Sequence, residues 1–133
     1  MTLTHPVIRR CGSDRGNATV EFALVTPMLL ALALAVLQLA LVLHVRTTLT
    51  AAAAEGARAA ALAGADLSAG ERRARALLEG NIAEGVVESI EVQRERRGSA
   101  LLLAVRIDAR VPLLGMLGPT TMAVEGHAVQ ERA

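Results

Sequence analysis

The sequence predicts an α+β chain with a long N-terminal hydrophobic helix that continues beyond its apolar part, a short second helix and a small three-stranded antiparallel sheet. Three observations lead to this fold class. An almost unbroken apolar run occupies residues 22–43, and an alanine-rich segment follows it. From Val86 onward, apolar and polar residues alternate with a period of two, as in a half-buried strand. Such a region after helical segments is typical of a sheet that helices cover on one face.

The apolar run is long enough to cross a membrane. Its 22 residues include no acidic or basic side chain. At about 1.5 Å per residue, a helix of this length measures roughly 33 Å, which matches the hydrocarbon core of a bilayer. We therefore predict a transmembrane helix at residues 17–46. Thr26 and Gln38 are its polar exceptions, and Pro27 is expected to bend the helix rather than to end it.

Three interpretations of this run are open. It can be a plain single-pass anchor. A cleaved secretory signal is disfavoured, because its apolar region should have only about 7–15 residues. The third interpretation rests on the flank of the run, where Gly16 is followed by four uncharged residues and then by Glu21, which directly precedes the run. An acidic residue at the bilayer centre costs roughly 2.5–3.5 kcal/mol, so Glu21 stays at the interface or meets a cationic partner.

The flank of the run carries a recognisable motif after a basic leader that holds Arg9, Arg10 and Arg15. The motif reads Gly16-Asn17-Ala18-Thr19-Val20-Glu21-Phe22. It resembles the prepilin signal of type IV pilin-like proteins, and in detail the TadE family of pseudopilins from tight-adherence (Flp-type) pilus systems. The later segment Glu55-Gly56-Ala57-Arg58, set among alanines, is also similar to that family. The resemblance covers roughly residues 15–63.

The resemblance implies a type IV pilin-like fold and the role of a minor pilin or pseudopilin in pilus assembly. A prepilin peptidase would cut between Gly16 and Asn17, and Phe22 would complete the motif for cleavage. Glu21 would become the fifth mature residue and the partner of the freed N-terminal amine. Implied partners are that peptidase, other pilins or pseudopilins, the pilus assembly platform and the membrane. Asn17 departs from the Phe of archetypal type IV pilins, which favours the Flp branch.

Two other functions stay open on the sequence alone. One is an uncleaved, single-pass anchor whose exposed domain binds an envelope component. The other is a pseudopilin of a type II secretion system, which shares the same chemistry and differs in its partners.

The expected organisation has three parts, which are a basic cytoplasmic leader at 1–16, the transmembrane helix at 17–46 and an extracytoplasmic pilin-like α+β head at 47–133. The excess of arginine before the apolar run predicts that the N-terminus is inside and the C-terminus outside. The protein is thus expected in the cytoplasmic (inner) membrane, and at the cell surface or in a pilus after assembly.

The first helix is expected to continue without a break to about Ala63, because alanine is the best helix former. Glu55 and Arg58 lie three residues apart and are expected to pair. The alanines either pack against helices of other subunits or face the protein's own sheet. Gly64-Ala65-Asp66 is expected to end or kink this helix.

A second helix is expected from about Ala69 to Glu79. Ser68 and Glu71 have the spacing of a capping box, with Ser68 as the N-cap. Its arginines form either a solvated face or a contact with anionic lipid headgroups. They are Arg72, Arg73 and Arg75.

Three strands should follow, separated by Gly98-Ser99 and by the loop Pro112–Pro119. The second strand is the clearest, with one apolar face and one charged face. Its apolar face consists of Leu101, Leu103, Val105, Ile107, Ala109 and Val111, and its polar face of Arg106, Asp108 and Arg110. In the third strand, from about Thr120 to Val129, the inward residues are Met122, Val124 and Ala128, and the outward ones Glu125 and His127. The helix from about Thr47 to Ala63 is the available cover for the dry face.

Composition argues for a structural role and against an enzyme. The net charge is +1 and aromatic residues make up 1% of the chain, so nothing indicates nucleic-acid binding. The three histidines, His5, His44 and His127, are scattered and do not suggest a metal site. Cys11 is the only cysteine and would leave with the leader. We expect no catalytic residue, no cofactor and no small-molecule substrate.

Overall fold

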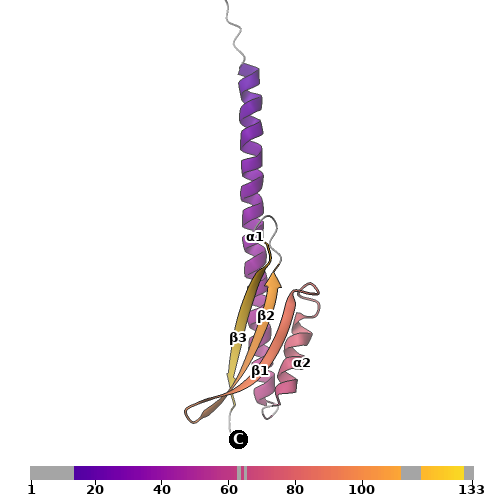
Figure 1. Ribbon diagram of the computed structural model, residues 1–133, viewed down its shortest axis with the longest axis vertical. Helices are drawn as coiled ribbons and strands as arrows, with labels where there is room; N and C mark the ends of the chain where they lie inside the picture. Colours follow the sequence, from indigo (N-terminus) through magenta and orange to yellow (C-terminus); the bar gives the residue numbers. More distant parts are fainter. Residues whose placement is uncertain (1–13, 63, 65, 112–117, 131–133) are drawn as a thin grey trace, which may run out of the picture. The chain divides into compact units, whose positions relative to one another are not determined.

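The structure is a computed structural model that describes residues 14–62, 64, 66–111 and 118–130. Its elements follow the order α1 (Asp14–Leu62), α2 (Leu67–Leu78), β1 (Val87–Arg97), β2 (Ala100–Val111) and β3 (Thr120–Val129) (Figure 1). The predicted α+β class, with two helices and a three-stranded antiparallel sheet, is confirmed. The chain forms two compact units, one that ends at Val36 and one that begins at Leu37.

Helix α1 is continuous over 49 residues and includes Pro27. As expected, it passes beyond the apolar run, and it ends at Leu62. Three threonines lie in its middle, although threonine is a poor helix former. The hydroxyls of Thr47 and Thr50 donate to the carbonyl oxygens of His44 and Arg46, both at 2.8 Å. These bonds satisfy the hydroxyls within the helix itself.

The sheet has the order β1-β2-β3, and both strand pairs are antiparallel. A tight turn at Gly98 and Ser99 joins β1 to β2, and Gly98 has φ of 64°, which suits glycine. The central strand places Val105 between Val92 of β1 and Gly126 of β3. The alternating pattern of the sequence is seen along β3 and from Val105 to Val111 of β2, whereas Ala104 is also buried and β1 has a register shift between Val87 and Ser89. The loop expected at Pro112–Pro119 lies outside the described residues except for its last two positions.

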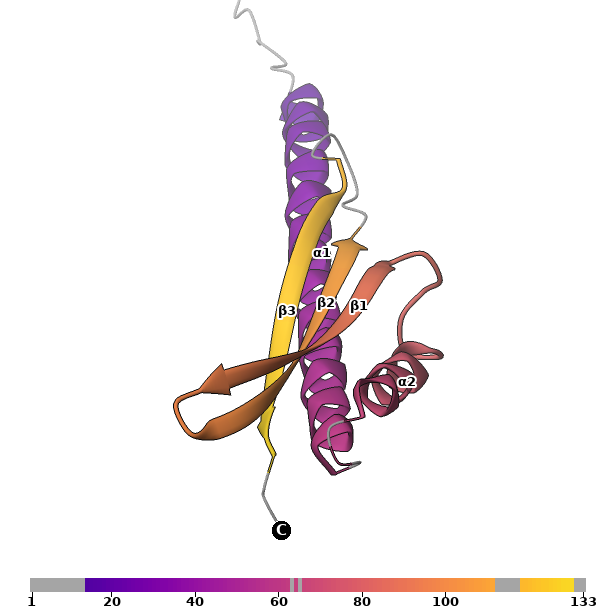
Figure 2. The ribbon, with the colours of Figure 1, turned by 60° about the horizontal axis from the view of Figure 1, so that its bottom comes forward.

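The second half of α1 covers the dry face of the sheet (Figure 2). Leu49 from the helix and Val105 and Ile107 from β2 are fully buried there. This arrangement decides between the two expectations for the alanines, because those on the inner side of α1 face the protein's own sheet. The buried alanines of α1 are Ala52, Ala53, Ala57 and Ala60.

Gly126 is the place where the sheet comes closest to α1. A Cβ atom on Gly126 would lie 2.5 Å from the carbonyl carbon of Ala53 and 2.5 Å from the backbone nitrogen of Ala54. These distances leave no room for any side chain at this position. The inward face of β3 thus rests on the helix backbone, which the sequence did not lead us to expect.

The start of α2 differs from the expectation. The N-cap is Asp66 and not Ser68, and the helix begins at Leu67 rather than Ala69. The Asp66 carboxylate accepts hydrogen bonds from the Ser68 backbone N–H at 3.0 Å and from the Ser68 hydroxyl at 2.8 Å. The carboxylate of Asp66, two residues upstream, therefore caps the helix in place of Ser68. The hydrogen bonds from Ser68 also lower the pKa of Asp66.

Candidate processing and assembly site

The predicted processing residues all lie in the first turns of α1. The helix begins at Asp14, so the peptide bond between Gly16 and Asn17 is helical in this structure. Gly16 is open to its surroundings, since no atom outside its own helical turn would come within 4 Å of an added Cβ. Asn17 and Glu21 are exposed, and Phe22 is 72% exposed.

Helical spacing brings Asn17 and Glu21 together on one face. They are four residues apart, which places side chains one above the other on adjacent turns. Phe22 is one residue further on and belongs to a neighbouring face. A carboxylate at Glu21 is therefore well placed to compensate a cationic group at Asn17.

The apolar part of α1 exposes large side chains on every side of the helix. A helix of this kind is stable in a membrane or among other helices rather than in water. The exposed large residues from this part are Val20, Phe22, Leu24, Val25, Met28, Leu29, Leu30, Leu32, Leu34, Val36, Leu37, Leu39, Leu41 and Leu43. Within the described part of the chain, α1 is the one helix long and apolar enough, by length and composition, to span a bilayer.

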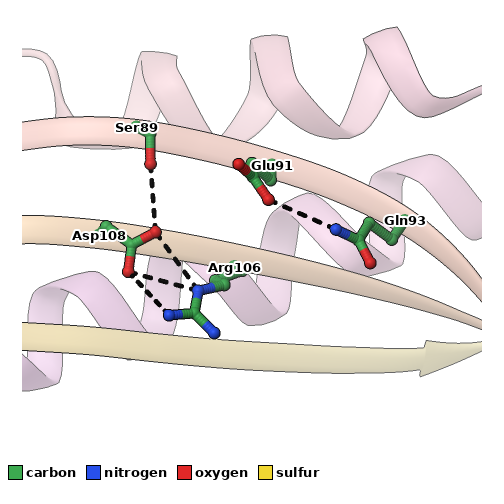
Figure 3. Close-up of polar contacts among 5 residues, drawn as sticks. All are labelled: Ser89, Glu91, Gln93, Arg106 and Asp108. Carbon is green, nitrogen blue, oxygen red and sulfur yellow. Dashed lines mark hydrogen bonds and ion pairs between the residues drawn. The ribbon is translucent and has the colours of Figure 1, made fainter.

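The outer face of the sheet carries a polar network (Figure 3). The Arg106 Nε donates to both carboxylate oxygens of Asp108 at 3.3 Å, and the Ser89 hydroxyl donates to Asp108 at 3.1 Å. These bonds, that from Arg106 above all, lower the pKa of Asp108. The carboxylate is therefore held as an anion in an ion pair, which suits a structural contact and not a proton donor.

The histidines do not form a metal centre in the part of the chain that the structure describes. His44 lies on α1, while His127 lies on β3 and is 3.4 Å from the Glu125 carboxylate. No group of three or more His, Cys, Asp or Glu side chains that could hold an ion occurs among the described residues. His5 and Cys11 lie outside them.

Sequence reasoning missed a surface cavity between the end of α2 and the start of β1. Glu79 and Glu84 lie on its rim, and Gly80 and Gly85 shape its loop. Both glycines have positive φ, 93° and 84°. Two Gly residues among acidic residues after a helix were the signal available for a shaped loop, but the strand beside it was needed to form a cavity.

By its length and composition, the exposed apolar helix followed by a small α+β domain indicates a class of proteins with one membrane anchor. Within that class, the family model described as TadE-like protein matches residues 16–58 of this chain. The predicted resemblance to the TadE-like family is thus confirmed over those residues, which include both Gly16–Phe22 and Glu55–Arg58. Comparisons with curated proteins and with solved structures gave no significant match.

The match lies within α1 and covers less than half of the chain, so it marks a likeness of that part to TadE-like proteins. The family is one of pilus-associated structural proteins and not of enzymes. The match begins at Gly16 and so contains all four predicted processing residues, although neither the match nor the fold tests what happens at them.

Proposed function

We propose that this chain is a minor pilin or pseudopilin of a tight-adherence (Flp-type) pilus and that a prepilin peptidase cuts it between Gly16 and Asn17. One observation carries the proposal. The TadE-like match starts at Gly16, and Glu21 lies one helical turn after Asn17, directly before the exposed apolar helix. A plain membrane anchor has no need for this combination.

The proposed cleavage hydrolyses one peptide bond. Water adds across it, so that Gly16 keeps a carboxylate and Asn17 gains an amine that is protonated near neutral pH. Glycine costs about 1 kcal/mol relative to alanine in a helix, so local opening of this bond for the peptidase is inexpensive. The leader 1–16 stays in the cytoplasm, residues 17–46 span the membrane and residues 47–133 form the extracytoplasmic head.

The new amine then needs a partner when the helix leaves water. In a low-dielectric bundle of pilin helices, an unpaired charge is strongly destabilising, whereas an amine and a carboxylate in contact are tolerated. Glu21 supplies the carboxylate, on the same chain or on a neighbouring subunit. The pair therefore fixes the axial position of one helix against the next as the assembly platform adds subunits.

The decisive experiment is Gly16→Ala in cells that contain the prepilin peptidase. We expect the precursor with the N-terminal residue Met1 to accumulate, as followed by denaturing gel and intact mass. Gly12→Ala, in the same leader, is the matched control and should still be cut. A product from Gly16→Ala that begins at Asn17 would contradict the proposal.

The same mass measurement on the unmodified chain addresses the alternatives. A native protein that retains the leader, with Arg15 present, would indicate the uncleaved envelope-binding anchor. A cut protein that is isolated with the platform of a type II secretion system, and not with that of a tight-adherence system, would indicate the other kind of pseudopilin.

A further inference from the structure

A cavity of about 320 Å³ lies between the C-terminal end of α2 and the first residues of β1. Apolar side chains line part of it, among them Leu78, Ile82 and Ile90. Two carboxylates on its rim, Glu79 and Glu84, are exposed and form no ion pair among the described residues. The cavity therefore offers an apolar floor with unpaired negative charge beside it.

Other charged side chains near this cavity already form ion pairs within the chain. Glu88 forms an ion pair with Arg110 at 2.6 Å, and Arg75 forms one with Glu71 at 2.8 Å. Among the described residues, no cation pairs with Glu79 or Glu84, since the nearby Arg75 and Arg110 pair with other carboxylates. An exposed carboxylate in this position is free to pair with a cation brought by another molecule.

The other end of β1 is basic and projects beyond the third strand. Strand β3 pairs with β2 as far as Leu102, and the Gln130 backbone N–H adds one hydrogen bond to the Leu101 carbonyl at 2.9 Å. The end of the β1-β2 hairpin, with Arg96 beside that bond and Arg97 beyond it, forms a two-stranded ribbon (Figure 2). Both arginines are exposed and make no ion pair within the described chain. A two-stranded ribbon without a core beneath it is marginally stable by itself, so a docking surface would stabilise it.

These two charged features cannot meet within one chain. Arg97 follows Glu88 by nine residues of continuous strand, which separates them by about 30 Å at roughly 3.3 Å per residue. We propose that the basic ribbon of one copy docks into the acid-rimmed cavity of a second copy. The arginine stems lie on the apolar floor, and their guanidinium groups pair with Glu79 and Glu84.

A contact between two unlike surfaces has a further consequence. After the contact forms, the copy that donates its ribbon keeps a free cavity and the other copy keeps a free ribbon, so that copies add head to tail. This inference concerns the head alone and holds whether or not the leader is removed. It goes beyond the proposed function, because it names a second copy as the partner and a specific pair of surfaces as the interface.

Disulfide trapping tests the contact in the full chain in detergent micelles, with Cys11→Ser as background. Ala83→Cys places a thiol at the cavity, and Ser99→Cys places one at the ribbon's turn. With the two variants on differently tagged chains, we expect a mixed dimer under mild oxidation, several-fold above that formed with Thr121→Cys as the matched control. A yield no greater than the control's would overturn the proposal.

Charge reversal then checks the pairing itself. Glu79→Arg with Glu84→Arg in the cavity chain should reduce the mixed dimer several-fold, and Arg96→Glu with Arg97→Glu in the ribbon chain should restore it. Circular dichroism confirms that each variant is folded. Trapping in whole membranes covers other occupants, since an Ala83→Cys product with a different protein and none with this chain would also overturn the proposal.

Discussion

Gly56 of α1 and Gly70 of α2 face each other where the two helices pack together. A Cβ atom on either residue would lie 2.9 Å from the carbonyl oxygen of the other. Real Cβ atoms do not approach a backbone atom so closely, so the pair requires glycine on both sides. Gly56 also belongs to the segment Glu55–Arg58, which gives that motif a packing role. Its two ends form the expected ion pair, Arg58 to Glu55 at 2.6 Å.

Gly56→Ala should destabilise the head despite the better helix propensity of alanine. Propensity alone favours the change by about 1 kcal/mol, but overpacking against the Gly70 backbone costs typically 1–3 kcal/mol. We expect a lower free energy of unfolding in a denaturant titration followed by circular dichroism. Gly16→Ala is the matched control, because it adds the same methyl group to the same helix in open space. Equal stability of the Gly56→Ala chain and the unmodified chain would contradict the contact.

Gly126→Ala should have a larger effect than Gly56→Ala. The added Cβ would meet the backbone of Ala53 and Ala54 at 2.5 Å, and a helix backbone cannot move aside as a side chain can. We expect a loss of more than about 3 kcal/mol, or failure of β3 to pack, seen as rapid proteolysis of the head. Ala123→Gly, on the exposed face of the same strand, serves as control and should cost no more than about 1 kcal/mol.

Asp66→Ala should lower the melting temperature of the head more than Ser68→Ala does. Asp66 accepts from both the backbone and the hydroxyl of Ser68, whereas loss of the Ser68 hydroxyl leaves the backbone bond in place. A melting temperature that falls further with Ser68→Ala would restore the capping-box assignment.

Asp108→Asn should change how stability depends on pH. The pKa of Asp108 is lowered from its ordinary value of 3.8 by the Arg106 hydrogen bond, so the unfolded chain takes up the proton first as the pH falls. The stabilising effect is complete well above pH 3.8 and is lost as the pH drops through the lower pKa of the folded state. We expect a smaller acid-side fall in melting temperature for Asp108→Asn. Asp66, whose pKa is also lowered, should still cause part of the decrease in melting temperature at acid pH. The double variant Asp66→Asn with Asp108→Asn should make that decrease smaller still.

Glu21→Gln should separate cutting from assembly. The peptidase acts at Gly16 and Asn17, so N-terminal sequencing should show normal processing. Recovery of the chain in sheared pili should fall, because glutamine cannot neutralise the new amine in a low-dielectric bundle. Glu55→Gln is a matched control on the same helix, since Glu55 pairs with Arg58 at the surface. Normal incorporation of Glu21→Gln would contradict the role of a charged pair in register.

The elements of this fold could be predicted because their patterns are local. Leu103, Val105 and Ile107 lie at every second position of β2 and are fully buried as expected, and the glycine turn at Gly98 joins the first two strands. The sequence did not decide whether the alanines of α1 pack against other helices or against the protein's own sheet, since alanine suits both equally. Only the position of β3 against Ala53 settled it.

The sequence could not predict the close backbone contacts that depend on a glycine having no side chain. In the sequence, Gly70 and Gly126 are ordinary glycines of a helix and a strand. The need for glycine at these two positions is seen only when the neighbouring backbone is known. The candidate processing site is the opposite case, because its motif is fully local. Gly16, Asn17, Glu21 and Phe22 were recognised from spacing and resemblance, and their place at the start of α1 adds the shared face of Asn17 and Glu21.

The close seating of β3 on α1 at Gly126 makes the interior of this domain thin. Its largest fully buried side chains are Leu49, Leu103, Ile107, Val105 and Val111, with no ring among them. The heat-capacity change on unfolding increases with the apolar surface that becomes exposed to water. For this head, that change should therefore lie below the usual value of about 12–15 cal/mol/K per residue. Its stability curve would then be flat, and the domain would hold nearly the same folded fraction in cold and in warm surroundings.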